Sequence, residues 1–182
     1  YRRGETNYPP SDGMPQLREA VQRLYERELQ LRYPLAAFLI AAGSRPVIYA
    51  AYRATVDPGD RVLYPVPSWN NNHYAHLTDA APVAIPCTAQ TRFLPTRAQL
   101  EPHLPGARLL CLNSPLNPAG TAIEAGALRD ICEAIVDENA VRARRDERPL
   151  FLLYDQIYQA LCLGDTVHAT PTGVLPEMAK YT

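Results

Sequence analysis

Asp155 is the acidic side chain whose position in the sequence is most informative, because it directly follows the apolar run Leu150 to Tyr154. Such a run predicts a buried strand, so the carboxylate emerges where that strand ends. A buried acid needs a partner, and the protonated nitrogen of a pyridine ring would supply one. The alternative is that Asp155 caps a following turn. Tyr158 follows three residues later and shares the site if the chain turns helical there.

A polar loop that contains two prolines follows a second apolar run. The run Arg108 to Leu112 predicts a strand, and the loop 113–120 (NSPLNPAG) comes directly after it. Asn117 precedes Pro118, which biases the Asn117 backbone to an extended conformation and gives its amide a fixed direction. That amide is suited to a hydrogen bond with a ligand. A rigid loop with no binding role is the alternative.

Two further segments carry candidate ligand-binding groups. Gly43-Ser44-Arg45 lies between a predicted strand and a predicted helix, where free backbone N–H groups and the helix dipole favour an anion such as phosphate. An ordinary turn between a strand and a helix would have the same composition. Trp69, the only tryptophan, follows a proline-rich segment after a strand, and it either stacks on a flat ligand or packs in the core or at an interface.

Short apolar strands alternate with amphipathic helices along the chain. The strands are predicted at 37–41, 61–64, 83–85, 108–112 and 150–154. The helices are predicted at 15–30, from 47 onward, at 68–77 with Ser68 as its cap, and at 97–104 and 122–141 after the capping boxes Thr96/Gln99 and Thr121/Glu124. This alternation predicts a three-layer α/β/α fold with a mainly parallel sheet. Ligands of such sheets bind beyond the carboxyl ends of the strands, where the candidate groups occur.

The composition favours a small-molecule partner. The chain has 18 Lys plus Arg against 19 Asp plus Glu, and this balance gives no electrostatic reason to expect nucleic acid or an anionic membrane as partner. No apolar run approaches the roughly 18 residues that a membrane helix needs. The four cysteines form no CxxC pair, so we expect free thiols, no metal site and a cytoplasmic protein.

In their order along the chain, these segments resemble the class I/II aminotransferases of fold type I, which depend on pyridoxal 5'-phosphate. That family has an arm tyrosine before Gly-x-Pro-x-Leu-Arg, a small phosphate-binding turn, an aromatic residue, an Asn-Ser-Pro-x-Asn-Pro-x-Gly loop and an Asp-x-x-Tyr element. The corresponding segments here are Tyr8 before 13–18 (GMPQLR), Ser44-Arg45, Trp69, 113–120 and 155–158 (DQIY). The resemblance implies an N-terminal arm at 1–13 and a cofactor-binding large domain at 14–182, without its C-terminal remainder and the small domain.

The resemblance also implies a role for each matching residue. Asp155 would form an ion pair with the ring nitrogen and keep it protonated, so that the ring accepts electron density from the substrate. Asn117 and Tyr158 would hydrogen-bond the ring 3-oxygen, and Trp69 would stack on the ring. Ser44 and Arg45 would bind the phosphate. Tyr8 would reach the phosphate of a neighbouring subunit, which implies a homodimer.

The Schiff-base lysine of the family has no counterpart in this pattern. Lys180 is the only lysine, and its segment 176–182 (PEMAKYT) resembles the loop that leads into the strand before that lysine, so we predict a surface residue. We therefore expect part of a longer aminotransferase that exchanges an amino group between an amino acid and a 2-oxo acid, with this chain inactive alone. The alternatives are a non-catalytic fragment or interaction module on the same fold, and a lyase that uses the same cofactor.

Overall fold

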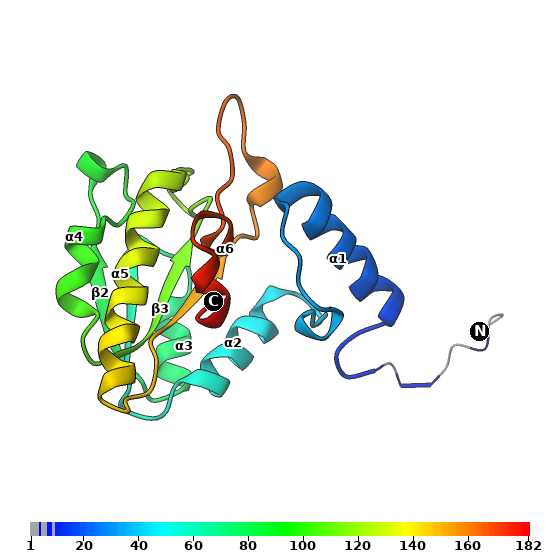
Figure 1. The fold of residues 1–182 in the computed structure, drawn as a ribbon, viewed down its shortest axis with the longest axis horizontal. Helices are drawn as coiled ribbons and strands as arrows, with labels where there is room; N and C mark the ends of the chain where they lie inside the picture. Colours follow the sequence, from blue (N-terminus) through cyan, green and yellow to red (C-terminus); the bar gives the residue numbers. More distant parts are fainter. Residues whose placement is uncertain (1–3, 5–6, 9) are drawn as a thin grey trace. The chain divides into compact units, whose positions relative to one another are not determined.

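The computed structural model describes residues 4, 7, 8 and 10–182. The chain forms two compact units, Tyr1–Val47 and Ile48–Thr182 (Figure 1). Helix α2 (Ser44–Thr55) contains the boundary between them. Within the described residues, no helix is both long enough and apolar enough to cross a membrane.

The larger unit contains a four-stranded, fully parallel sheet with the strand order β2-β1-β3-β4. Its strands are β1 (Arg61–Val66), β2 (Ala81–Pro86), β3 (Ala107–Asn113) and β4 (Phe151–Asp155). The connecting helices are α3 (Asn71–Leu77), α4 (Arg97–Leu100), α5 (Ala125–Arg144) and α6 (Pro171–Val174), with short 3₁₀ turns at Ala89–Thr91, Glu101–His103, Gln159–Leu161 and Pro176–Lys180.

Alternating side chains of the strands build a core on each face of the sheet. On one face, Leu63 of β1 and Leu110 of β3 belong to the cluster that includes the apolar stripe of α5. On the other face, Val62 and Leu109 pack with Tyr52 and Tyr74, which come from α2 and α3. Neighbouring residues of one strand thus point to opposite faces, as a sheet that is buried on both sides requires. The three-layer α/β/α prediction is confirmed (Figure 1).

In the smaller unit, the Gly-x-Pro-x-Leu-Arg segment forms the start of a helix. Helix α1 (Pro15–Leu29) matches the helix predicted from Pro15, and that proline occupies its first turn, where a missing N–H costs nothing. Gly13 has a φ of +99°, a backbone conformation that favours glycine. Arg18 forms an ion pair with Asp12 and donates a 2.8 Å hydrogen bond to the Leu35 carbonyl. Through Arg18, helix α1 is therefore attached both to the residue Asp12 before it and to the residue Leu35 after it.

Replacing Gly13 with alanine is expected to destabilise this unit by about 1–3 kcal/mol. A Cβ at position 13 would lie 2.5 Å from the Cβ of Ile40, and the positive φ adds strain. Amide hydrogen exchange across α1 would report the loss of protection. Gly126→Ala in α5 is the matched control, because a Cβ there meets nothing within 4 Å and alanine favours a helix. Unchanged exchange in Gly13→Ala would show that the segment accommodates the side chain.

Three local predictions were wrong. The strand expected at 37–41 is absent, because its backbone groups find partners nearby: Phe38 N–H donates to Leu35 O, and Ile40 N–H donates to Asp12 O. The helix expected after a Ser68 cap begins at Asn71 instead, and the Ser68 hydroxyl accepts from the Asn71 side chain at 3.4 Å.

The third wrong prediction concerns the start of α5. This helix begins at Ala125 instead of 122, because the Thr121 hydroxyl donates to the Arg92 carbonyl at 3.0 Å and caps nothing. By contrast, the capping box of Thr96 and Gln99 forms as predicted and starts α4.

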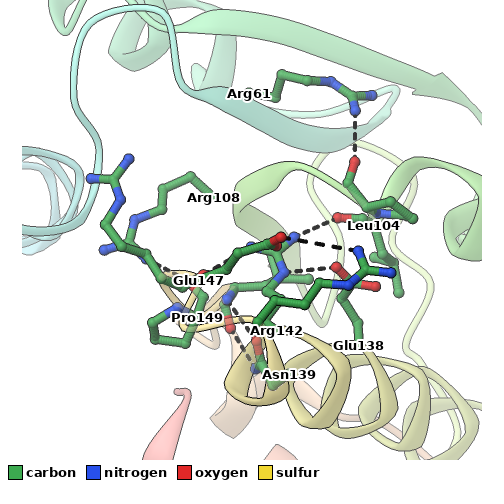
Figure 2. A network of polar contacts seen from close by, with 12 residues as sticks. Arg61, Leu104, Arg108, Glu138, Asn139, Arg142, Glu147 and Pro149 are labelled. Carbon is green, nitrogen blue, oxygen red and sulfur yellow. Dashed lines mark hydrogen bonds and ion pairs between the residues drawn. The ribbon is translucent and has the colours of Figure 1, made fainter.

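A polar network lies at the amino ends of the strands, away from the edge where the candidate site residues occur (Figure 2). Arg142, near the end of α5, is buried; its guanidinium pairs with Glu138 at 2.7 Å and donates to the Leu104 carbonyl at 2.8 Å. Asn139 exchanges two hydrogen bonds with the backbone of Leu150, at 2.7 and 2.9 Å. These contacts attach α5 to the segments that lead into β3 and β4.

Candidate functional site

The carboxyl ends of β3 and β4 bring two candidate segments together. Asn113 and Asp155, the last residues of these strands, are Cα partners in the parallel register. The Asn113 side-chain amide donates to the Asp155 carbonyl at 2.9 Å, and the Ser114 N–H donates to the same carbonyl at 3.0 Å. The loop 113–120 and the turn after Asp155 therefore leave the sheet side by side.

Asn117 and Tyr158 meet above this edge. The Asn117 side-chain amide donates to the Tyr158 hydroxyl oxygen at 3.3 Å, and the Asn117 backbone N–H donates to the Asn113 side-chain oxygen at 2.8 Å. The loop also has a structural role, as the rigid-loop alternative proposed, because the Ser114 hydroxyl accepts a hydrogen bond from Ile123 N–H at 2.9 Å and so connects the loop to the segment that follows it. The predicted neighbourhood of Asn117 and Tyr158 thus appears in the structure.

The carboxyl group of Asp155 is half-buried, and burial raises its pKa above the ordinary value. Its Oδ1 accepts a hydrogen bond from Ile157 N–H at 3.1 Å, which opposes that increase. One oxygen of the Asp155 carboxylate therefore caps the following turn, as the alternative interpretation proposed. Cys111, which interacts with Asp155 electrostatically, is buried in β3, and burial raises the pKa of its thiol to about 12. At neutral pH the Cys111 thiol is therefore uncharged, and it neither repels nor neutralises the Asp155 carboxylate.

This environment predicts that the cofactor-free Asp155→Asn variant is more stable than the wild type at neutral pH. A carboxyl whose pKa is higher in the folded state binds its proton more tightly there, so stability falls as pH rises from the unfolded to the folded pKa. An asparagine side chain does not ionise, so the stability of the variant lacks this dependence on pH. Thermal midpoints should therefore be higher in the variant at neutral pH, and the difference should shrink in acid. A lower midpoint for the variant at neutral pH would mean that the carboxylate is well solvated or paired.

Trp69 lies in the loop after β1 and is 57% exposed. Trp69 therefore does not pack in the core of this chain, whereas packing at an interface and stacking on a ligand both stay predictions. The buried Tyr52 connects the sheet to the start of α3, which follows the loop of Trp69. Its hydroxyl is 3.1 Å from the Cys111 sulfur and donates to Asn71 Oδ1 at 3.4 Å. The sequence patterns did not indicate this connection between β3 and the loop of Trp69.

Ser44, Arg45 and Tyr8 belong to the smaller unit. Ser44 and Arg45 are exposed at the start of α2, the predicted location for a phosphate-binding turn, and Tyr8 is fully exposed. Their phosphate-binding roles stay predictions.

Lys180 is exposed at the end of the 3₁₀ turn Pro176–Lys180, as predicted for a surface residue. The next residue, Tyr181, accepts a 2.7 Å hydrogen bond from the Leu152 N–H of β4. The lysine therefore lies in a segment that leads toward the edge of the sheet.

The larger-unit site has the groups that a flat ring with a protonated nitrogen requires. A half-buried carboxylate gains most from a cationic N–H partner, because that partner offsets the cost of burial. The Tyr158 hydroxyl accepts from Asn117 and so keeps its own proton for a ligand oxygen. These features fit the ring of pyridoxal 5'-phosphate. Within the described residues, no three His, Cys, Asp or Glu side chains are arranged to hold a metal ion.

Comparison with known proteins shows the family of this chain. The family model "Aminotransferase class I and II" matches residues 2–182. The aspartate aminotransferase of Rhizobium meliloti (strain 1021) is 32% identical over 182 residues, which cover 99% of this chain and 42% of that relative. An aspartate/prephenate aminotransferase of Cereibacter sphaeroides (strain ATCC 17029 / ATH 2.4.9) is 31% identical, with 98% of this chain and 43% of the relative covered. The chain thus spans less than half the length of these relatives.

Solved structures show the same fold. The crystal structure of the Rhizobium meliloti aspartate aminotransferase superposes with a TM-score of 0.87 at 32% identity, covering 97% of this chain and 42% of that one. The Thermus thermophilus aspartate aminotransferase with maleate has a TM-score of 0.86 at 26% identity, covering 97% and 44% of the two chains. The match of the family model over almost the whole sequence establishes that the chain belongs to the class I and II aminotransferase family.

Proposed function

We propose that the protein containing this chain is a pyridoxal-phosphate-dependent aminotransferase, which moves an amino group between an amino acid and a 2-oxo acid. One observation carries the proposal: in a chain of this family, Asn117, Asp155 and Tyr158 come together at the carboxyl ends of β3 and β4. In such sheets this is the edge at which ligands bind. The cofactor-binding large domain then corresponds to residues 14–182, after an arm at 1–13.

Each of these residues has a defined task toward the ring. Asp155 would hold the proton on the ring nitrogen, and the cofactor, when bound, would supply an electron sink for the amino acid substrate. The burial that raises the pKa of the Asp155 carboxyl also leaves its carboxylate poorly solvated, and a cationic N–H partner would offset that cost. Asn117 and the Tyr158 hydroxyl orient the ring by hydrogen-bonding its 3-oxygen. Trp69 covers a ring face, and its exposure leaves room for that contact.

The remaining parts of the proposal concern the phosphate, the subunits and the compartment. Ser44 and Arg45, at the start of α2, bind the phosphate through a helix N-terminus and a cationic side chain. Tyr8, fully exposed in the arm, reaches the phosphate site of a second copy, so the protein is a homodimer. The four cysteines are unpaired, which supports a reducing compartment such as the cytoplasm.

Aspartate is the amino donor to test first, because the names of the Rhizobium meliloti and Cereibacter sphaeroides relatives include it. The complete gene product, loaded with pyridoxal 5'-phosphate, is incubated with aspartate and a 2-oxo acid, and the new amino acid is measured by mass spectrometry. Its formation, with aspartate consumed in equal amount, is the expected result. Release of carbon dioxide or ammonia without transfer would indicate a lyase instead. Loss of the cofactor on dialysis with no turnover would contradict the proposal altogether.

A further inference from the structure

We propose that Asn113 is a positioning residue: its side-chain amide holds Asn117 and Asp155 at a fixed separation, so that both reach one cofactor ring. The inference rests on the proposed function and extends it to a residue that does not itself touch the ring. Asn113 is the last residue of β3, and its Cα partner across the parallel register is Asp155.

The amide of Asn113 uses both of its ends in this arrangement. Its nitrogen donates to the backbone carbonyl of Asp155 at 2.9 Å, and its oxygen accepts from the backbone N–H of Asn117 at 2.8 Å. One planar group of fixed length therefore connects the main chain of the two residues proposed to bind the ring nitrogen and the ring 3-oxygen. The side chain is half-buried, which limits how far water can replace either bond.

The two residues also carry bonds of their own that pass this restraint on to their side chains. Asp155 Oδ1 accepts from Ile157 N–H at 3.1 Å, which sets the direction of the carboxylate relative to its backbone. The Asn117 amide donates to Tyr158 at 3.3 Å, which sets the direction of that amide. Displacing either backbone segment would shift a ligand-facing group by a similar distance. Binding sites lose much of their effect when such groups move by about 1 Å.

The chemistry of position 113 is restrictive. A residue there must donate to a carbonyl and accept from an N–H with two atoms at the end of a short side chain, which an asparagine amide does. Leucine has a similar shape without either polar atom, and aspartate keeps the acceptor but has no donor at neutral pH. Leucine thus tests the whole bridge, and aspartate tests the bond to Asp155 separately.

The test is a double-mutant cycle in the complete gene product, with the dissociation constant of pyridoxal 5'-phosphate as the readout, measured by absorbance titration. Asn113→Leu is expected to weaken cofactor affinity roughly tenfold, since the backbones of Asn117 and Asp155 are no longer held at the separation that the ring requires. In an Asn117→Ala background the same change is expected to cost about threefold or less, because part of what Asn113 positions has been removed. Asn113→Asp should fall between the wild type and Asn113→Leu.

A residue that only stabilises the fold would behave differently. Its replacement would lower the thermal midpoint, while the cost in affinity would be the same in both backgrounds. Equal costs, or an unchanged affinity in Asn113→Leu, would overturn the proposal. Asn113→Ala replaces the leucine variant in the same cycle if that variant does not fold. Asn72→Leu, on the exposed surface of α3, is the matched control and should leave affinity unchanged. If the wild type itself fails to bind the cofactor, the proposed function is wrong.

Discussion

Replacing Asp155 with alanine in the complete gene product is expected to lower the turnover of transamination at least a hundredfold, which corresponds to about 3 kcal/mol of lost transition-state stabilisation. Without the carboxylate, the ring nitrogen has no partner to keep it protonated, and electron withdrawal from the substrate weakens. The fold should survive, because Asp155 ends a strand and its half-buried side chain supports no core cluster. Steady-state kinetics together with circular dichroism would separate the two effects.

The matched control for this variant is Asp130→Ala, because Asp130 is exposed on α5. Its turnover should equal that of the wild type. Full activity in Asp155→Ala would remove the electron-sink role from this residue. If Asp155→Ala were unfolded, Asp155→Asn, which retains the size of the side chain, would take its place.

Replacing Arg142 with methionine is expected to lower the free energy of unfolding by about 3–5 kcal/mol, because the change leaves a buried carboxylate without its partner. The side chains of Arg142 and Glu138 are only 6% and 15% exposed. The variant also removes the hydrogen-bond donor of the Leu104 carbonyl (Figure 2) and of the Arg148 carbonyl. Chemical denaturation of the complete gene product would measure the loss.

Arg145→Met provides the comparison for this prediction. Arg145 immediately follows α5, but its side chain is 66% exposed and lies 4.0 Å from Glu147. A surface pair of this kind contributes about 0–1 kcal/mol, so the control should unfold almost like the wild type. Equal stability losses in the two variants would show that burial of the Arg142 pair does not matter.

The parallel sheet could be predicted because its evidence is local. Each strand of the larger unit is a short apolar run bounded by Gly, Pro or polar residues, and such runs are visible without knowledge of their neighbours. The strand expected at 37–41 failed for the converse reason. Its residues are apolar, but whether they pair with another strand depends on distant parts of the chain, and here Ile40 N–H donates to Asp12 O instead. The start of α5 was misplaced similarly, because Thr121 bonds to Arg92 rather than to the helix.

The candidate site was predicted through its motifs and not through its contacts. Asn117, Asp155 and Tyr158 stand in recognisable short patterns, and the structure brings Asn117 to Tyr158. Asn113 belongs to the same loop, but its bridge depends on the register between β3 and β4, which no local pattern specifies. A polar residue at the last position of a buried strand was the available signal, and it would have identified Asn113 as it identified Asp155.

The most direct test of the proposed function is the near-ultraviolet and visible absorbance spectrum of the complete gene product after mixing with pyridoxal 5'-phosphate and exhaustive dialysis. The proposal predicts a retained cofactor band that changes when aspartate is added, because the site then exchanges its amino group with the substrate. A spectrum without retained cofactor would contradict the assignment of Asn117, Asp155 and Tyr158 to a cofactor ring.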